Sequence, residues 1–254
     1  ILPDLAAGCS MADMANLAKV ERCWRELGEV LEDPDASITP VTYINSAADL
    51  KAFCGEHGGI VCTSTNAPKI LDWAFAQREK VLSFPDQHLG RWTGFKKDIP
   101  LEQMVVWDPD QEYGGLTPDE IRNARILLWK GHCSVHQMFQ ESHIRRWRMQ
   151  HPEGFVISHP ESNLDVCLNS DHVGSTEFII NTIKDAPDNT QWLVGTELNL
   201  VSRLCMCSTM QRIDPQHLAW ALENLADGNV VNRISVPQHE AELARLALER
   251  MLAV

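Results

Sequence analysis

Cysteines that could bind a metal are spread along the chain in separate short motifs. Cys9, Cys133 and the Cys205–Cys207 pair lie far apart in the sequence. Thiolates that converge from different loops can bind an iron–sulfur cluster, because iron in such clusters favours soft sulfur ligands. The chain has no CxxC pair, however, and free cysteine is among the most buried residue types. Spacing alone does not decide between a cluster ligand and a buried core cysteine. The cysteines on helical patterns, Cys23, Cys54 and Cys167, are better explained as buried core residues.

Histidine and glutamate side chains near these motifs could transfer protons. His136 follows Cys133 by three residues, one turn along an expected helix, so it could face the same cavity as the thiolate. His159 and Glu161 alternate at the end of an expected strand, where burial or a neighbouring charge can move either pKa toward neutrality. The alternatives are a surface histidine at 136 and an ordinary His-Pro-Glu turn.

Two further motifs could hold a polar or anionic ligand. Tyr43 and Asn45 alternate at another strand end and therefore point to one face. Gly174-Ser175-Thr176 opens an expected helix, and backbone amides at a helix N-terminus can bind phosphate or carboxylate. Many such turns are simple N-caps, so this motif also leaves two interpretations open.

These motifs lie in the loops of an expected α/β architecture. Short apolar runs of strand character alternate with segments of helical spacing, and Thr117 begins a capped-helix sequence. This alternation predicts parallel sheets with helices on both faces, in which ligands bind beyond the carboxyl ends of the strands. The expected strands are 41–44, 59–62, 80–84, 104–107, 126–129, 155–158, 171–173 and 192–194. The expected helices are 47–56, 66–77, 135–149, 176–184 and 236–252.

Composition limits the possible partners. The chain has 254 residues, of which 44% are hydrophobic and 22% charged, as in an ordinary globular protein. Its net charge of −13 disfavours nucleic acids and membrane surfaces. No uncharged apolar run approaches the roughly 18 residues needed to cross a bilayer, so we expect a soluble protein. A chain of this length needs no disulfides for stability, and we expect its eight cysteines to be reduced.

The first residues of the chain allow one more interpretation. Leu5–Cys9 resembles a bacterial lipoprotein cleavage site, which would make the protein an exported binding protein anchored through Cys9. No charged region and no apolar stretch precede this site, so we reject the interpretation. The sequence from Ile1 reads like the end of a strand, and we expect that a preceding segment is missing.

Taken together, these loops resemble quinolinate synthase, an enzyme family of NAD biosynthesis in bacteria and plastids. The matching motifs occur in the family's order across nearly the whole chain, so chance agreement is negligible. They are residues 2–13, 40–45, 62–67, 85–90, 130–136, 159–161, 174–176, 194–197 and 207–210.

The resemblance implies a fold and a cofactor. Family members have three similar αβα units around a pseudo-threefold axis, each of which contributes one cysteine to a central 4Fe-4S cluster. The third ligand position matches Cys207 better than Cys205, because it stands three residues before the Met that corresponds to Met210. Cys62 matches no ligand position, and one iron is left open to act as a non-redox Lewis acid. The implied ligands are Cys9, Cys133 and Cys207.

The resemblance also implies a reaction and residue roles. The family condenses iminoaspartate with dihydroxyacetone phosphate to give quinolinate, phosphate and water. By family match, Tyr43 and Asn45 contact the substrate, and Ser64 and Thr176 bind its carboxylate or phosphate. The residues expected to handle protons and substrate oxygens are His136, His159 and Glu161. We expect a functional link to L-aspartate oxidase, and a location in the bacterial cytoplasm or, in a plant, in the plastid.

The implied domain division departs from a complete family member. The first unit would be largely missing, and the segment between Arg203 and Cys205 is shorter than in the family, so a true deletion there would keep Cys207 from the cluster. We expect a monomer or homodimer. The alternative function is a catalytically inactive α/β module that binds small molecules and lacks a cluster. The expected units are 1–36 as the end of the first, 37–125 as the second, 126–228 as the third, and 229–254 as a strand and helix that pack on the first.

Overall fold

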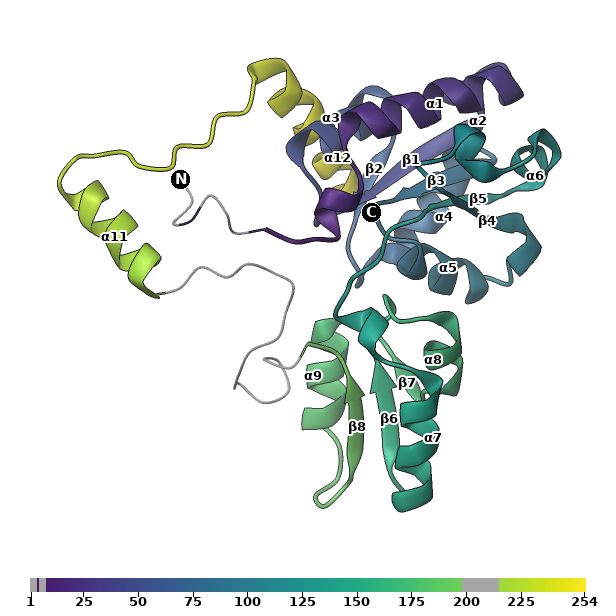
Figure 1. Ribbon diagram of the computed structural model, residues 1–254, viewed down its shortest axis with the longest axis vertical. Helices are drawn as coiled ribbons and strands as arrows, with labels where there is room; N and C mark the ends of the chain where they lie inside the picture. The colour runs from purple at the N-terminus through teal and green to yellow at the C-terminus, as the bar shows by residue number, and fades with distance from the viewer. Residues whose placement is uncertain (1–3, 5–7, 198–214) are drawn as a thin grey trace.

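The strands of the protein form two parallel sheets, as seen in a computed structural model that describes residues 4, 8–197 and 215–254 (Figure 1). The five-stranded sheet has the order β2-β1-β3-β5-β4, and the three-stranded sheet has the order β7-β6-β8. Every strand pair among the described residues is parallel, which confirms the α/β class. The strands are β1 (Ile38–Tyr43), β2 (Ile60–Cys62), β3 (Lys80–Phe84), β4 (Met104–Trp107), β5 (Ile126–Trp129), β6 (Phe155–Ser158), β7 (His172–Val173) and β8 (Trp192–Gly195).

Helices cover both faces of the five-stranded sheet, because its strands are apolar on both sides. On β5, Leu127 and Trp129 point to one face, whereas Ile126 and Leu128 point to the other. All four side chains are fully buried. The first face packs against α1 (Leu17–Leu31), α3 (Ala48–Glu56), α6 (Pro118–Asn123) and α12 (Gln238–Ala253). The second face packs against α4 (Ala67–Gln77) and α5 (His88–Phe95).

The strand at Ile126–Trp129 belongs to this sheet, and our expectation that it opens the following unit is wrong. It pairs with β3 on one side and with β4 on the other. The physical reason is burial, since its alternating side chains are covered by the helices on both faces of the five-stranded sheet. Local pattern predicted the strand but not its neighbours.

The helix α12 packs against α3 and β2 of the five-stranded sheet. The closest approach is at Gly55, where a Cβ would lie 1.9 Å from the carbonyl oxygen of Leu243, so only glycine fits. Arg250 donates a hydrogen bond of 2.7 Å to the carbonyl oxygen of Gly59. Residues 229–237 form no strand, in contrast to the one expected before this helix.

The three-stranded sheet has a smaller core. Its helices are α7 (Glu141–Gln150), α8 (Leu164–Asn169) and α9 (Thr176–Lys184). The remaining described elements are α2 (Pro34–Ser37), α11 (Pro215–Ala226) and the 3-10 turns η1 (Ala12–Met14), η2 (Leu101–Gln103), η3 (Glu112–Gly115) and η4 (His136–Met138). Within the described ranges, no helix is both long enough and apolar enough to cross a bilayer.

The helix predicted over residues 135–149 is interrupted, so that prediction is wrong in its boundaries. The turn η4 is followed by an extended backbone at Phe139 and Gln140 before α7 begins. Gln140 forms a capping box with His143, which satisfies the first amides of α7. By contrast, the helix start predicted at Thr117 is confirmed by a complete capping box.

Candidate active site

Loops at the carboxyl ends of strands from both sheets meet at one place. Tyr43 ends β1, His136 lies in the segment after β5, and Glu161 lies in the segment after β6. The Glu161 carboxylate accepts a hydrogen bond from the Tyr43 hydroxyl and lies against the His136 ring. The parallel-sheet rule predicted sites at strand ends, and here the ends of two sheets contribute to one site.

Glu161 is the centre of this cluster. The residue is only 3% exposed, and its Oε2 lies 3.2 Å from Nδ1 of His136. Its backbone N–H donates to Nδ1 of His159 over 3.3 Å. The two imidazole rings stack with centroids 4.4 Å apart and an interplanar angle of 13°. These three residues therefore form one buried acid–base set.

The members of this set differ in charge. Burial alone would raise the pKa of Glu161, but the hydrogen bond with His136 and the charge of His159 outweigh it and lower that pKa. Burial opposes charge on His136, yet the neighbouring Cys133 and Glu161 raise its pKa to about 9. Burial lowers the pKa of His159 to about 4. Because Nδ1 of His159 accepts a backbone N–H, the neutral ring carries its proton on Nε2.

Tyr43 is held as a neutral phenol beside this set. Burial, the charge of Glu161 and the hydrogen bond to it raise the pKa of Tyr43, while a hydrogen bond from Ser64 acts in the opposite direction. The adjacent thiol of Cys62 has its pKa raised to about 12 by burial and by the charges of Asp86 and Glu161. Cys62 therefore stays a thiol near neutral pH and is a poor nucleophile or metal ligand.

Donor atoms for a metal gather next to the acid–base set. Ligand atoms of Cys133, His136 and Glu161 lie within 4.8 Å of one another. Nε2 of His136 is buried and has no hydrogen-bond partner among the residues that the structure describes. Because buried polar atoms are normally paired, this nitrogen is placed as if to face a bound group.

The Cys9 segment lies against the Cys133 loop. The hydroxyl oxygens of Ser10 and Ser134 are 3.3 Å apart, which brings the two cysteine-containing turns side by side. Both cysteines are partly exposed and pack against the same core cluster of the five-stranded sheet. The predicted third ligand, Cys207, lies outside the described residues, as does Cys205.

A cavity of about 240 Å³ opens between the two sheets. Its lining includes Ser64, which bonds to Tyr43, and Ser175 at the N-terminus of α9. Lys96 is the cationic side chain in the described lining, and none of the described lining residues is a carboxylate. The Lys96 ammonium lies 5.8 Å from the centre of the Trp92 ring. An ammonium together with a helix N-terminus favours an anionic ligand.

The whole of this site lies in a region with known relatives. The family model described as quinolinate synthetase A protein matches residues 1–253. The chain belongs to the quinolinate synthetase A family. The quinolinate synthase of Herpetosiphon aurantiacus is 54% identical over 271 residues, which cover 100% of this chain and 72% of that protein. For the quinolinate synthase of Rhodopirellula baltica the identity is 53%, with 100% and 69% coverage. The resemblance inferred from the motifs is confirmed.

The structure brings together most of the residues that the sequence singled out in this quinolinate synthetase A chain. Asn45 and Thr176 are exposed, and the cavity next to Thr176 is lined by Gly174 and Ser175 instead. His136 lies on a short 3-10 turn rather than a long helix, but it still faces Cys133. The residues brought together are Tyr43, Ser64, His136, His159 and Glu161.

The sequence analysis missed Asp86 as a member of this site. Asp86 is 2% exposed, and its Oδ1 accepts the N–H of Leu89 over 2.6 Å, whereas its Oδ2 has no partner among the described residues. Burial and the charge of Glu161 raise its pKa well above the usual value. A signal was available, because Asp86 lies two residues after the carboxyl end of β3, whereas Glu161 lies three residues after that of β6.

Proposed function

We propose that this protein is a quinolinate synthase, which condenses iminoaspartate with dihydroxyacetone phosphate to form quinolinate, phosphate and two water molecules in NAD biosynthesis. The observation that carries the proposal is the buried set of Glu161, His136 and His159 next to the Cys133 thiol. Membership of the quinolinate synthetase A family and the names of the relatives support it.

The acid–base set suits the proton transfers of such a reaction. Protons must leave the reacting carbon and nitrogen atoms and reach the departing oxygens. We assign Glu161, a buried carboxylate, as the general base and His136, an imidazolium, as the general acid. His159 donates from Nε2 to a substrate oxygen. A positioned acid or base contributes about 10² to 10⁴ in rate.

The surrounding residues are proposed to bind and orient the substrates. Tyr43 and Asn45 contact the substrate at the end of β1, and Tyr43 does so as a neutral phenol. Ser64 and Thr176 bind carboxylate or phosphate at the mouth of the cavity between the sheets. Lys96 gives this cavity a positive charge that suits the phosphate of the triose.

We also propose that Cys9, Cys133 and Cys207 hold a 4Fe-4S cluster. The described residues fit such a group, because Cys9 and Cys133 lie on adjacent turns and the buried Nε2 of His136 beside them has no partner among those residues. When bound, a cluster held by three thiolates supplies one iron that acts as a Lewis acid. The raised pKa of Cys62 makes this buried thiol a suitable control.

We also propose how the αβα units of the protein are organised. The two sheets would correspond to two of three αβα units around a pseudo-threefold axis, with residues 1–36 and 229–254 contributing to the contacts with a further unit. The protein would act in the cytoplasm as a monomer or homodimer. L-Aspartate oxidase is the class of enzyme that would supply the unstable imine substrate.

Iron and acid-labile sulfide content after anaerobic reconstitution tests the proposal, together with quinolinate formation from the two substrates. We expect iron to be lost in Cys9→Ala, Cys133→Ala and Cys207→Ala and retained in Cys62→Ala. A wild-type protein with neither iron nor quinolinate formation would favour the inactive α/β binding module and contradict the proposal.

A further inference from the structure

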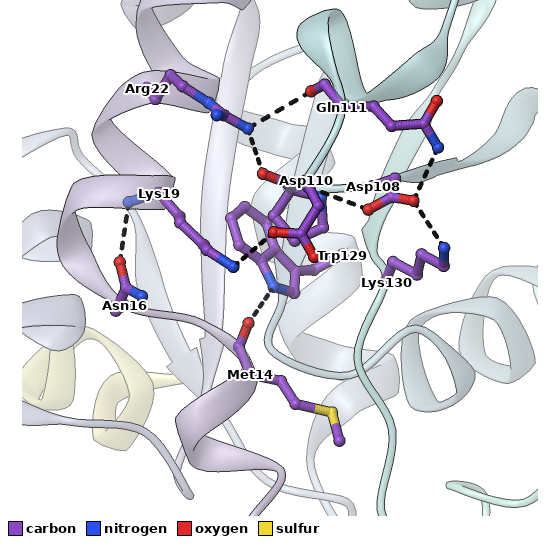
Figure 2. Close-up of polar contacts among 10 residues, drawn as sticks. Met14, Asn16, Lys19, Arg22, Asp108, Asp110, Gln111, Trp129 and Lys130 are labelled. Carbon is purple, nitrogen blue, oxygen red and sulfur yellow. Dashed lines mark hydrogen bonds and ion pairs between the residues drawn. The ribbon is translucent and has the colours of Figure 1, made fainter.

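The segment that carries Cys9 is fastened to the five-stranded sheet by contacts that involve no metal. The indole Nε1 of Trp129, the last residue of β5, donates to the backbone carbonyl of Met14 over 2.9 Å (Figure 2). The backbone N–H of His132 donates to the sulfur of the same Met14 over 3.3 Å. Met14 therefore bonds to the residues on both sides of the Lys130-Gly131 turn that leads to Cys133.

We propose that Met14 and Trp129 are positioning residues that hold Cys9 beside Cys133 before any metal binds. We call the contacts of Met14 with Trp129 and His132 the clamp. This inference rests on the proposed function, because it assigns the two residues a role in preparing two of the three cluster ligands. The Ser10–Ser134 contact of 3.3 Å joins the residues that follow the two cysteines and keeps the two turns together. The N–H of Asp13 bonds to the carbonyl of Cys9 over 3.3 Å, so Cys9 is part of the same turn as the clamped residues.

The packing at Gly131 explains how the segments come so close. A Cβ at this position would lie 1.9 Å from the carbonyl oxygen of Pro85 and 3.3 Å from the Cβ of Met14. Only a residue without a side chain lets the Pro85 loop and the Met14 turn reach the same point. The N–H of Gln87 also donates to the Gly131 carbonyl over 3.1 Å. Three loops are thus locked together next to Cys133.

The helix after the clamp is tied to the same side of the sheet. Lys19 pairs with Asp110 at 2.8 Å, as Figure 2 shows. Arg22 donates to the carbonyl of Pro109. Lys130, beside Trp129, pairs with Asp108 at 2.6 Å. Exposed ion pairs contribute little individually, so the contacts of Lys19 and Arg22 mainly orient α1. The bond from the fully buried Trp129 is the contact expected to matter most.

The clamp makes a measurable difference to Cys9 in the metal-free protein. Losing one buried hydrogen bond shifts a local opening equilibrium by about fivefold. If the clamp closes over the Cys9 turn, Trp129→Phe should raise the rate of Cys9 alkylation in the apoprotein by about that factor. The rate is measured by mass spectrometry of the Cys9 peptide, so labelling of other cysteines does not interfere.

Trp107→Phe is the matched control. Trp107 is paired in register with Trp129 on the neighbouring strand and is equally buried. It packs on Gly114 in the loop after β4 rather than on the Met14 turn. Both substitutions remove a buried indole, so we expect similar losses of thermal stability, but only Trp129→Phe should accelerate Cys9 labelling. Met14→Leu, which keeps an apolar side chain without the sulfur acceptor, provides a second variant that should act in the same direction.

Cluster assembly gives an independent readout. We expect slower iron incorporation in Trp129→Phe and Met14→Leu, followed by visible absorbance, and unchanged incorporation in Trp107→Phe. Equal Cys9 labelling in all variants, or equal acceleration by Trp107→Phe and Trp129→Phe, would overturn the inference. A wild-type protein that binds no iron would instead contradict the proposed cluster, and the labelling result would still decide whether the clamp exists.

Discussion

The two sheets of this protein differ in construction and in what they bring to the site. The five-stranded sheet has a core on each face, and its fully buried side chains include Trp107, Trp129 and Phe84. The three-stranded sheet has one small core, formed by Ile144, Val156 and Val166. Several of its large apolar side chains are exposed, among them Met149, Leu168, Phe178 and Ile180.

The contributions to the site follow this difference. The larger sheet positions Cys133, the Cys9 segment and Tyr43, whereas the smaller one carries His159 and Glu161. Local stability depends on buried apolar contacts, so the smaller sheet should open at lower free energy. Cys9 and Cys133, the two proposed cluster ligands that the structure describes, therefore lie on the well-packed part. His159 and Glu161 depend on how firmly the smaller part is docked.

The largest effect is expected from removing the carboxylate of the smaller sheet. Glu161→Gln should lower kcat by about 10² to 10⁴ and leave the iron content unchanged, because Cys9 and Cys133 are held by the five-stranded sheet. The assay is quinolinate formation with parallel iron analysis. Glu153→Gln, an exposed position in the turn before β6, is the control and should retain activity. Loss of iron in Glu161→Gln would mean that the two contributions are not separable.

Core truncations should show that the two sheets differ in stability. Leu127→Ala on β5 is expected to lower the free energy of unfolding by about 2 to 5 kcal/mol. Ile144→Ala on α7 should cost about 2 kcal/mol, at the low end, because its small cluster can relax around the cavity. Urea unfolding measures both.

Hydrogen exchange locates the two effects. In Ile144→Ala we expect faster exchange confined to β6, β7 and β8, with protection of β1 to β5 unchanged. Exchange that rises equally in both sheets would show that they unfold as one cooperative body, and the contrast between them would then have no functional meaning.

The cavity between the sheets offers a test of anion binding. Lys96→Gln should raise KM for dihydroxyacetone phosphate by about fivefold with little change in kcat, because the ammonium acts on the bound anion and not on the proton transfers. Lys97→Gln is the control, since this neighbour is paired with Asp72 at 2.6 Å and is not in the cavity lining. Equal KM values for the two variants would remove Lys96 from substrate binding.

The smallest effect concerns the ion pair between the loop after β4 and the residue that follows β5. Hydrogen bonds from Lys130 and Gln111 lower the pKa of Asp108 to about 2, from 3.8. Because the folded pKa is the lower one, the stabilisation is present above about pH 4 and is lost as the pH falls toward about 2. Lys130→Met should therefore lower the melting temperature only slightly at neutral pH, with no difference from wild type at the acid end. Thermal melts of both proteins across this pH range measure the effect. A gap between wild type and Lys130→Met that widens as the pH falls would contradict the role given to the Asp108–Lys130 pair.

Local sequence patterns predicted most elements because each is short, apolar and bounded by turn residues. The strands at 80–84, 104–107 and 126–129 have the predicted bounds, as does the helix at 176–184. What the patterns could not specify is pairing. Nothing local in Ile126–Trp129 indicates that it inserts between β3 and β4, since that position depends on side chains far away in the chain.

The site was predictable to the same degree. The rule that ligands bind at strand ends located Tyr43, His159 and Glu161, but their mutual contact joins residues more than a hundred positions apart. Residues 135–149 have helical spacing throughout, and the extended backbone at Phe139 and Gln140 became visible only in the structure. Asp86 also follows the carboxyl end of a strand, β3, so the same rule extends to it.

The close fit of α12 against Gly55 has a consequence for synthesis on the ribosome. The larger sheet is made first, but its outer helical layer is completed by residues 238–253, which are translated after the entire smaller sheet. Until then, the apolar surface of α3 and β2 is uncovered, and nascent chains are exposed to misassembly in such intervals. The smaller sheet therefore has time to fold and dock before the final helix covers that surface.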